Sequence, residues 1–551
     1  MNDISVIIGG KAGDGINSAG AIIAQLINHL GYSLYLYFDY PSLIRGGHNY
    51  AIIRGTDRPE SPGTHALDTG FLLALDQATV DQHAGRQQDP AAIIFNADLV
   101  RSAGQGVPVK TILQELQAPE IMGNSALIGG FAKAAGIGWD VVEGVFRSHI
   151  PKAADTNLRV ARRAYDLLKT VKAIPQGNNP PRPLVTGNEA IGLGLVQGGL
   201  DAYVSYPMTP SSGVLHFLAA EKDRFGITVL HPENEIAVIL MALGFAAAGK
   251  KAAVGTSGGG FCLMTEGLSL AGMAEVPVVI VMSQRTGPST GLPTYTGQAD
   301  LRFVIHAGQG EFPRFIVAPG NAEEAVVWSA RAMDLAWRCQ VPAFILADKT
   351  LSEGTYSMPF PGDPGLPGAI SGWDGDGEYR RYAITPGGVS PLAAVGTKGA
   401  VVKVNSYAHD EDGITTEEAG TVLGMAGKRT AKEESLRREL ARYEQVRVSG
   451  SRDSSTALLV WGSPAGACTL AGEALGLRVV RPVVLWPFPG DALRAALGGV
   501  NRVIAVEENQ TGQFADLAAA NGIAVSDRIL KYDGRPFVPD ELVGRITEVL
   551  R

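Results

Sequence analysis

Short apolar runs alternate with longer amphipathic runs through the first third of the chain. In order, the pattern predicts the strand ISVIIGG, the helix INSAGAIIAQLINHLGY, the strands SLYLYFDY, NYAIIRG, FLLALD and AAIIFNAD, and the helix RVARRAYDLLKTV. This alternation of strands and helices is typical of a parallel or mixed sheet covered by helices.

A second segment of the same kind follows the proline- and asparagine-rich stretch IPQGNNPPRP, which predicts a linker. Its predicted helices are GNEAIGLGLVQGGL, PSSGVLHFLAAEKDRFG and IAVILMALGFAAAG, and its strands are DAYVSYPM, ITVLHPENE, KAAVGTS, VPVVIVMSQ and PAFILAD. Glycine and proline then dominate residues 359–391, so we expect little regular structure there.

The polar stretch SYAHDEDGITTEE leads into a predicted helix, KEESLRRELARYEQV. A third segment has strands in TALLVWG, LRVVRPVVLWPFP and NRVIAVEEN, with a helix from Ala465. The fold class is therefore α/β with three α/β domains. Their predicted bounds are 1–173, 184–358 and 453–551, joined by a linker at 174–183 and a connecting segment at 359–452.

Composition narrows the functional classes. A length of 551 residues exceeds one core, and 45% hydrophobic with 19% charged residues indicates a globular chain. A net charge of −8 argues against a general nucleic-acid binder. The three separated cysteines exclude a four-cysteine iron–sulfur or zinc site within this chain. We expect a cytoplasmic protein without a signal peptide or a membrane span.

Two glycine-rich turns punctuate the first domain. GGKAGDG includes Gly13 and Gly15 between a strand and a helix, where backbone N–H groups can face an anion. YPSLIRGGHN carries Arg45 ahead of two glycines. A plain tight turn and a surface arginine are the alternatives, since neither turn matches a nucleotide-binding signature.

The second domain has polar motifs where its strands end, which is where open α/β sheets bind ligands. In YPMTPSS the two prolines hold Thr209 on a rigid turn. Ser211 or Ser212 is expected to cap the following helix, which leaves Thr209 free to face a ligand.

The next motif, HPENE, ends in Glu235. A carboxylate at a helix start is often only a partner of the helix dipole. The helix after Glu235 is apolar throughout, so we expect it to be nearly all buried. Glu235 would then be partly removed from water, which makes its protonated form accessible. Glu233 is the rival carboxylate, but only Glu235 directly precedes the apolar helix.

Two further strand ends carry TSGGGF and QRTGPSTG. Three successive glycines permit close approach of the backbone to a ligand. Arg285 follows an apolar strand and can hold a carboxylate in a bidentate pair. For one such arginine alone, a solvated loop residue is the simpler interpretation.

Together, YPMTPSS, HPENE, TSGGGF and QRTGPSTG resemble the pyrimidine-binding domain of the thiamine-diphosphate-dependent 2-oxoacid:ferredoxin oxidoreductases. GGKAGDG and YPSLIRGG, in this order, resemble the gamma domain of the same family. Residues 453–551 are similar to its transketolase C-terminal-type domain, to which we assign no catalytic residue. The resemblance implies an alpha subunit with a fused gamma-type domain, with Met208 in place of the commoner isoleucine.

The resemblance also implies roles. Glu235 activates the thiamine, and Thr209 and Arg285 bind the 2-oxoacid. The other cofactor-binding positions are Tyr206, Pro207, Thr256, Ser257 and Gly258, and the possible coenzyme A or anion positions are Gly13, Gly15 and Arg45.

No metal ligand is expected on this chain, because it lacks the motif for the diphosphate-bound Mg²⁺. The resemblance implies a beta subunit that holds Mg²⁺, a [4Fe-4S] cluster and half of the thiamine diphosphate site. It further implies coenzyme A as cosubstrate, ferredoxin as electron acceptor and an α2β2 assembly, with neither nucleic acid nor a membrane as partner. The best substrate guess is 2-oxoglutarate, converted reversibly to succinyl-CoA and CO2.

Three alternatives remain open from the residues. A lipoamide-linked 2-oxoacid dehydrogenase component shares the second and third domains, but it would lack the first. An indolepyruvate-specific relative lies within the same family. A non-catalytic nucleotide- or CoA-binding scaffold subunit belongs to a different class altogether.

Overall fold

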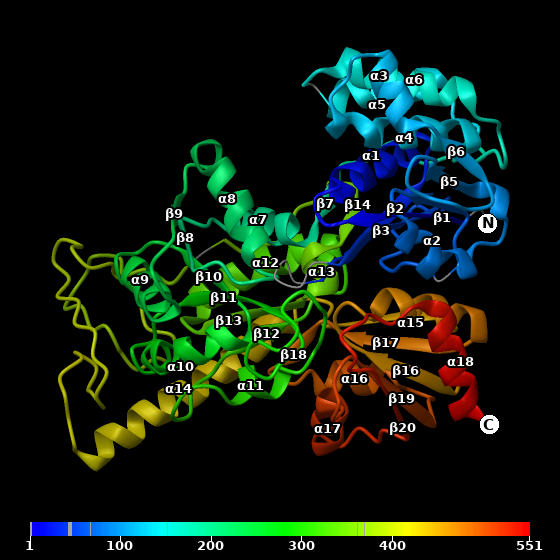
Figure 1. Cartoon of the computed structure of the whole chain (residues 1–551). Helices are drawn as coiled ribbons and strands as arrows, with labels where there is room; N and C mark the ends of the chain where they lie inside the picture. Colours follow the sequence, from blue (N-terminus) through cyan, green and yellow to red (C-terminus); the bar gives the residue numbers. More distant parts are fainter. Residues whose placement is uncertain (1–2, 42–46, 67, 151, 361, 369) are drawn as a thin grey trace. The chain divides into compact units, whose positions relative to one another are not determined.

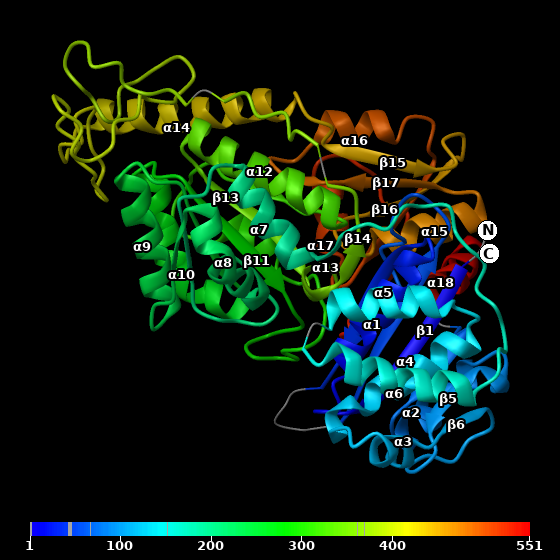
Figure 2. The same ribbon diagram turned by 90° about the horizontal axis from the view of Figure 1, so that it is seen from above.

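The computed structural model describes residues 3–41, 47–66, 68–150, 152–360, 362–368 and 370–551 (Figures 1 and 2). The chain forms two compact units. Unit 1 comprises Met1–Val185, Glu353–Phe360 and Val538–Glu541, and unit 2 comprises Thr186–Ser352, Pro361–Phe537 and Leu542–Arg551. Among the described residues, no helix is long and apolar enough to cross a membrane.

Unit 1 is built on a mixed sheet in the order β6-β5-β4-β1-β3-β2-β14-β7. Its strands are β1 (Asp3–Lys11), β2 (Ser33–Asp39), β3 (His48–Thr56), β4 (Phe71–Ala74), β5 (Ile93–Asn96), β6 (Gln105–Val107), β7 (Leu184–Thr186) and β14 (Thr355–Ser357). β1 lies parallel to β4 and antiparallel to β3. The sheet contains β14 because that strand, from far along the chain, pairs antiparallel with β2.

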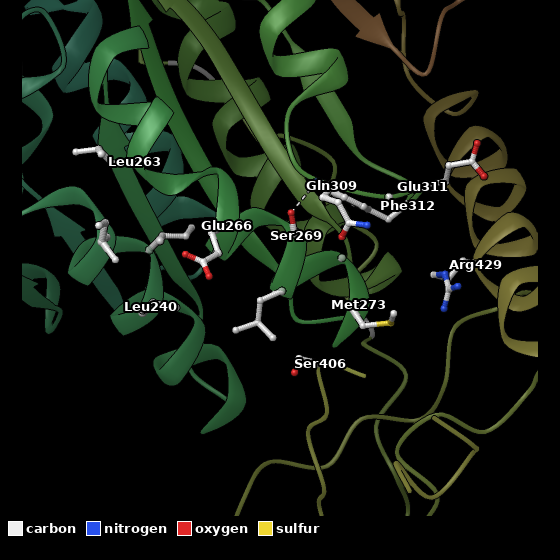
Figure 3. Close-up of a pocket in the computed structure, with 16 residues that line it drawn as sticks. Leu240, Leu263, Glu266, Ser269, Met273, Gln309, Glu311, Phe312, Ser406 and Arg429 are labelled. Atoms are coloured by element: carbon white, nitrogen blue, oxygen red, sulfur yellow. Dashed lines mark hydrogen bonds between the residues drawn. The ribbon is translucent and has the colours of Figure 1, made fainter. Parts of the chain in front are cut away.

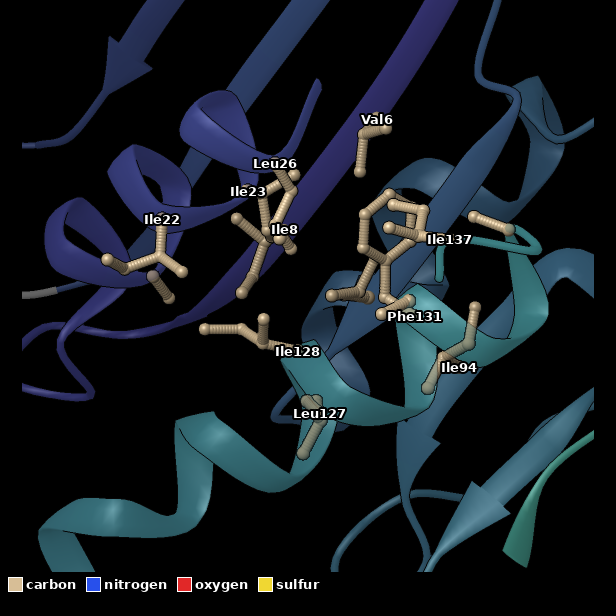
Figure 4. Packing of buried hydrophobic residues seen from close by; sticks show 14 of the residues in the cluster. Val6, Ile8, Ile22, Ile23, Leu26, Ile94, Leu127, Ile128, Phe131 and Ile137 are labelled. Atoms are coloured by element: carbon tan, nitrogen blue, oxygen red, sulfur yellow. The ribbon is translucent and has the colours of Figure 1, made fainter. Parts of the chain in front are cut away.

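Helices cover both faces of this sheet: α1 (Ile16–His29), α2 (Gln77–His83), α3 (Val109–Glu115), α4 (Gly123–Ala134), α5 (Trp139–His149) and α6 (Ala154–Leu167). Successive residues of a strand face opposite sides. Val6 and Ile8 therefore join the larger core with α1 and α4 (Figure 4), while Ile7 joins a smaller cluster with Val80 of α2. Short 3₁₀ helices occupy Ala84–Arg86, Pro90–Ala92 and Glu120–Met122.

Unit 2 contains a sheet in the order β18-β12-β13-β11-β10-β8-β9. The strands are β8 (Ala202–Ser205), β9 (Thr228–Leu230), β10 (Ala252–Thr256), β11 (Val278–Gln284), β12 (Phe315–Val317), β13 (Pro342–Asp348) and β18 (Val484–Trp486). All neighbours are parallel except β18, which pairs antiparallel with β12. The helices are α7 (Gly187–Gln197), α8 (Ser212–Phe225), α9 (Glu235–Ala247), α10 (Gly258–Met273), α11 (Leu301–His306), α12 (Ala322–Cys339) and α13 (Lys349–Glu353).

The carboxyl-terminal part of unit 2 has its own sheet, β15-β17-β16-β19-β20. Its strands are β15 (Val446–Gly450), β16 (Thr456–Val460), β17 (Arg478–Pro482), β19 (Arg502–Glu507) and β20 (Asp527–Leu530), and its helices are α15 (Ala465–Leu475), α16 (Gly490–Ala496), α17 (Gln513–Ala520) and α18 (Pro539–Leu550). The run LRVVRPVVLWPFP was predicted as one strand, but it divides into β17 of this sheet and β18 of the neighbouring one.

The predicted α/β class and the order of its elements are confirmed. The connecting segment differs at both ends of its predicted helix, which stops at Leu440 and not at Val446, the first residue of β15. Its helix α14 (Ala419–Leu440) begins 13 residues before the predicted start at Lys432. The amphipathic signal was missed because three glycines and several polar residues dilute it. Figure 2 shows α14 beside α12, which it contacts.

Candidate active site

The four predicted motifs of the second domain come together at one edge of a sheet. The motifs 206–212, 231–235, 256–261 and 284–291 follow β8, β9, β10 and β11. These strands are parallel and adjacent, in the order β11-β10-β8-β9. Their carboxyl ends therefore lie side by side, as the sequence predicted for a ligand site of an open α/β sheet.

The turn after β8 is held by side chains that donate hydrogen bonds to its main-chain carbonyls. Asn188, buried at the start of α7, donates from Nδ2 to the Pro210 carbonyl at 2.9 Å. Ser211 occupies the N-cap position of α8, but its hydroxyl donates to the Met208 carbonyl at 2.8 Å. The sequence predicted that Ser211 or Ser212 caps this helix. Ser211 does occupy the N-cap position, but its side chain makes no capping hydrogen bond because its hydroxyl closes the preceding turn. Thr209 is left half-buried.

Arg285 reaches this turn from the neighbouring strand end. Its Nη1 donates to the Thr209 carbonyl at 2.9 Å, so two predicted substrate-binding positions are in direct contact. Its Nε is buried and has no hydrogen-bond partner within the described residues. Burial lowers the pKa of the guanidinium, while the nearby carboxylate of Asp300 acts in the opposite direction. A half-buried arginine with an unused N–H group differs from a solvated loop residue.

Asp300 belongs to the same site, although the sequence reasoning did not single it out. An added Cβ at Gly258 would lie 2.9 Å from a carboxylate oxygen of Asp300. The carboxyl group thus lies beside the first residue of α10, where a helix favours negative charge. Burial raises its pKa to about 6, and Arg285 opposes that shift. The polar run GLPTYTGQAD after Arg285 was the available signal.

Glu235 is separated from its rival by burial. Its side chain is 4% exposed at the first position of α9, whereas Glu233 is exposed. Asn234 caps the helix by accepting from the Ala237 N–H at 2.9 Å, so Glu235 is not needed as a cap. An added Cβ at Gly260 would lie 2.6 Å from Glu235 Oε1. The carboxylate therefore lies against the backbone of the triple-glycine turn.

The remaining residues that the sequence predicted to bind the cofactor lie on the same turns. The hydroxyl of Ser257 is buried without a hydrogen-bond partner in the part of the chain that the structure describes. Thr256 is buried and its hydroxyl lies beside Gly260. Tyr206 is exposed, with its ring 5.8 Å from that of His231, and Pro207 is half-buried.

One expectation about α9 was wrong. The helix is not nearly all buried, because Ile236, Leu240 and Met241 are 44–46% exposed. Leu263 of α10 is 48% exposed. We call these four residues the apolar face of α9 and α10. An all-apolar sequence cannot tell a helix buried within its own chain from one that leaves a face for another surface.

A cavity of about 580 Å³ opens along this face (Figure 3). Ile236, Leu240 and Leu263 line it together with Glu266 of α10 and Arg429 of α14. None of the predicted site residues lines the cavity. The candidate active site is thus a different place, at the strand ends.

In unit 1, the predicted anion site is partly described. Gly13 and Gly15 have φ values of 98° and 72°, which glycine adopts without strain. Gly15 is the N-cap of α1, without a side-chain cap and with no acidic residue in the first turn. Arg45 lies outside the described residues.

The three cysteines are free, with Cys339 and Cys468 buried and Cys262 exposed. Within the described ranges, no group of three or more His, Cys, Asp or Glu side chains is placed to hold a metal ion.

Comparison with known proteins shows the family to which this chain belongs. Residues 5–167 match the family model of pyruvate ferredoxin/flavodoxin oxidoreductase. Residues 194–427 match that of the thiamine-diphosphate-binding domain of pyruvate flavodoxin/ferredoxin oxidoreductase. The chain is 31% identical to the 2-oxoacid:ferredoxin oxidoreductase subunit alpha of Saccharolobus solfataricus, over 100% of this chain and 98% of that relative. The chain belongs to the alpha subunits of the 2-oxoacid:ferredoxin oxidoreductases.

Other members of this family are similar over different lengths. The 2-oxoglutarate oxidoreductase subunit KorA of Mycobacterium tuberculosis is 29% identical, with coverage of 72% of this chain and 64% of that relative. Among solved structures, the 2-oxoglutarate:ferredoxin oxidoreductase from Magnetococcus marinus, with 2-oxoglutarate, coenzyme A and succinyl-CoA bound, superposes with a TM-score of 0.90. That structure is 27% identical, and both chains are covered completely.

The predicted family and the α/β class are thus confirmed. Full-length similarity also decides between this 2-oxoacid:ferredoxin oxidoreductase family and the lipoamide-linked dehydrogenase components.

Proposed function

We propose that this alpha subunit acts in a coenzyme-A-dependent 2-oxoglutarate:ferredoxin oxidoreductase, which reversibly converts 2-oxoglutarate to succinyl-CoA and CO2. The proposal rests on the Magnetococcus marinus structure, which is similar over its whole length and contains 2-oxoglutarate and succinyl-CoA. Two KorA subunits of 2-oxoglutarate synthases are also relatives, at 26% identity.

The observation that carries the proposed site is the contact between Arg285 and Thr209 at the strand ends. Arg285 has one N–H group committed to the Thr209 carbonyl and another buried without a partner. A carboxylate placed there would satisfy the unused N–H in a charge-assisted hydrogen bond. Arg285 and Thr209 therefore bind and orient the carboxylate beside the 2-oxo group.

The residues around Glu235 fit thiamine diphosphate. The Ser257 hydroxyl is buried without a partner, and the triple-glycine turn would be filled by a Cβ. When bound, thiamine diphosphate supplies the carbon nucleophile that attacks the 2-oxo carbon. Glu235 holds a proton at N1′ of the aminopyrimidine, and its burial keeps water away from that proton. Tyr206, Pro207, Thr256 and Gly258, at the neighbouring strand ends, are the other proposed contacts of the cofactor.

A beta subunit completes the site in this proposal and carries Mg²⁺, the diphosphate contacts and a [4Fe-4S] cluster that passes electrons to ferredoxin. The support from this chain is the apolar face of α9 and α10, which begins one residue after Glu235. Exposed apolar patches of this kind mark surfaces that another protein covers. On the basis of the family resemblance we further propose an α2β2 assembly in the cytoplasm.

We propose that the gamma-type domain binds the anionic end of coenzyme A. The amino end of α1, with Gly13 and Gly15, offers N–H groups that no side chain caps. Arg45, which lies outside the described residues, is the charge that the sequence offers for the anionic end of the molecule.

The test is coenzyme-A-dependent viologen reduction by the complex with its beta subunit. We expect 2-oxoglutarate to be oxidised with a higher kcat/KM than pyruvate or branched 2-oxoacids. A preference for pyruvate would overturn the substrate assignment. Arg285→Ala and Arg285→Lys should each lower kcat/KM by about ten- to a hundredfold, because a lost charge-assisted bond costs about 1.5–3 kcal/mol. Two unaffected variants would show that the carboxylate is bound elsewhere.

A further inference from the structure

The segment that carries Arg285 returns to its own start and is closed by hydrogen bonds at its base. Thr286 donates from its hydroxyl to the Thr296 carbonyl at 2.6 Å. The Asp300 N–H donates to the Gln284 side-chain oxygen at 3.0 Å. We call residues 285–300 the substrate loop. The returning residues 296–300 are thus hydrogen-bonded to Gln284 and Thr286, the two residues that flank Arg285. A displacement of residues 296–300 would therefore also move Arg285.

The returning part is itself held by Gln298, whose side chain is fully buried. Its Nε2 donates to the Trp461 carbonyl at 2.9 Å, and its Oε1 accepts from the Glu508 N–H at 3.0 Å. Its own main-chain N–H donates to the Glu508 carbonyl at 2.7 Å. All three hydrogen bonds go to the carboxyl-terminal sheet of unit 2, at the ends of β16 and β19.

These partners are held by a hydrogen-bond network that joins Trp461 to residues 507–515. The Trp461 indole N–H donates to Glu507 at 3.1 Å. The same carboxylate accepts from the N–H groups of Phe514 and Ala515, each at 2.9 Å, at the start of α17. Asn509 accepts from the Gly512 N–H at 2.7 Å. No catalytic residue was assigned to this part of the chain from its sequence, but in the structure its VEENQTGQ run (506–513) forms a hydrogen-bonded platform.

One side chain of the platform also contacts the substrate loop and the residues after it. Gln513 donates to the Ala299 carbonyl at 2.7 Å and accepts from the Arg302 N–H at 2.9 Å. Unlike Gln298, Gln513 is only partly buried, so its removal leaves the core intact. The loop is thus tied to the carboxyl-terminal sheet at two neighbouring residues.

We propose that Gln298 is a positioning residue for the 2-oxoacid, with the platform 506–513 as its support. Through Thr296 and Asp300 it sets the base of the substrate loop, and through that base the direction of the Arg285 guanidinium. The proposal rests on the proposed function, in which Arg285 binds the substrate carboxylate. It gives the carboxyl-terminal domain a part in substrate binding beyond assembly.

The experiment uses the complete complex with its beta subunit and three variants. Gln298→Met should raise KM for the 2-oxoacid on the order of tenfold, with kcat changed by less than about threefold, because the substrate is bound less well but reacts by the same route. Amide hydrogen exchange across residues 285–300 should become faster. Gln513→Ala should act in the same direction by several-fold. The control Asp516→Asn alters exposed ion pairs with Arg302 and Arg528 and should leave KM unchanged.

An unchanged KM and unchanged exchange in both Gln298→Met and Gln513→Ala would overturn the proposal, even if the melting temperature of Gln298→Met falls. Should Gln298→Met fail to fold, Gln513→Ala decides alone. Arg285→Lys, measured in parallel, separates the two proposals. Loss of kcat/KM in Arg285→Lys with normal Gln298 and Gln513 variants rejects only the positioning role. Normal Arg285→Lys kinetics reject the proposed substrate site itself.

Discussion

Arg285 and Asp300 are close enough to shift each other's pKa. A 2-oxoacid bound at Arg285 would therefore interact electrostatically with both side chains. The pKa of Asp300 is raised to about 6 by burial. Below that pH the Asp300 carboxyl is neutral, so the positive charge of Arg285 attracts the substrate carboxylate without opposition. Above it, a second carboxylate opposes the substrate's own.

We therefore expect KM for the 2-oxoacid to rise by about three- to tenfold as the pH increases from 5 to 7. Asp300→Asn should flatten this dependence, since the amide does not ionise. The measurement is KM against pH for both forms of the complex. A dependence that persists in Asp300→Asn would assign it to another group.

Glu235 carries the second prediction at this scale. Glu235→Gln should lower kcat by about 10²–10⁴-fold, the usual cost of losing general acid–base assistance, while the complex still assembles. Glu233→Gln is the matched control, because Glu233 is exposed two residues away and should leave kcat unchanged. Steady-state rates with size-exclusion chromatography test both variants. Reversed effects would make Glu233 the partner of the thiamine.

At the scale of elements, α14 is held to the body of unit 2 by buried charges. Glu275, which follows α10, accepts hydrogen bonds from Lys428 and Lys432 of α14, and all three side chains are at most 2% exposed. The two ammonium groups hold the pKa of Glu275 at about 2, against the effect of its burial. This cluster fixes the helix that closes one side of the cavity.

Removing the anion leaves two buried ammonium groups without a charged partner. Glu275→Gln should destabilise unit 2 by about 3–5 kcal/mol, the usual result of breaking a buried pair from one side. Denaturant unfolding measures this loss. Glu434→Gln, on an exposed position of the same helix, is the control and should change stability by less than ~0.5 kcal/mol. Equal stability of the two variants would contradict the anchoring role.

At the scale of the whole molecule, the chain has an active-site edge and an apolar face but only three separated cysteines. The purified alpha chain alone should therefore be colourless and inactive, and both colour and viologen reduction should appear when the beta subunit is added. Iron and acid-labile sulfide analysis checks this. Stoichiometric iron and sulfide in the isolated alpha chain would show that a cluster forms without the beta subunit.

The sequence by itself determined the elements and the strand-end motifs. Alternating apolar runs specify strands and helices locally, and glycine, proline and polar residues mark where they end. Since parallel strands share one carboxyl edge, the motifs at Thr209, Glu235, Thr256 and Arg285 were predictable as one site. The same motifs also carried the resemblance to the 2-oxoacid:ferredoxin oxidoreductases.

Only the tertiary structure decided which side chains meet between distant segments. Asp300 joins Gly258, and Gln298 joins Trp461 and Glu508, through contacts that leave no periodic signal. The exposed face of α9 was equally hidden, because an apolar sequence has the same pattern whether its own chain or another surface covers it. A local pattern shows which residues favour an apolar environment. Which residues or surfaces provide that environment depends on how the sheets and helices are arranged in space.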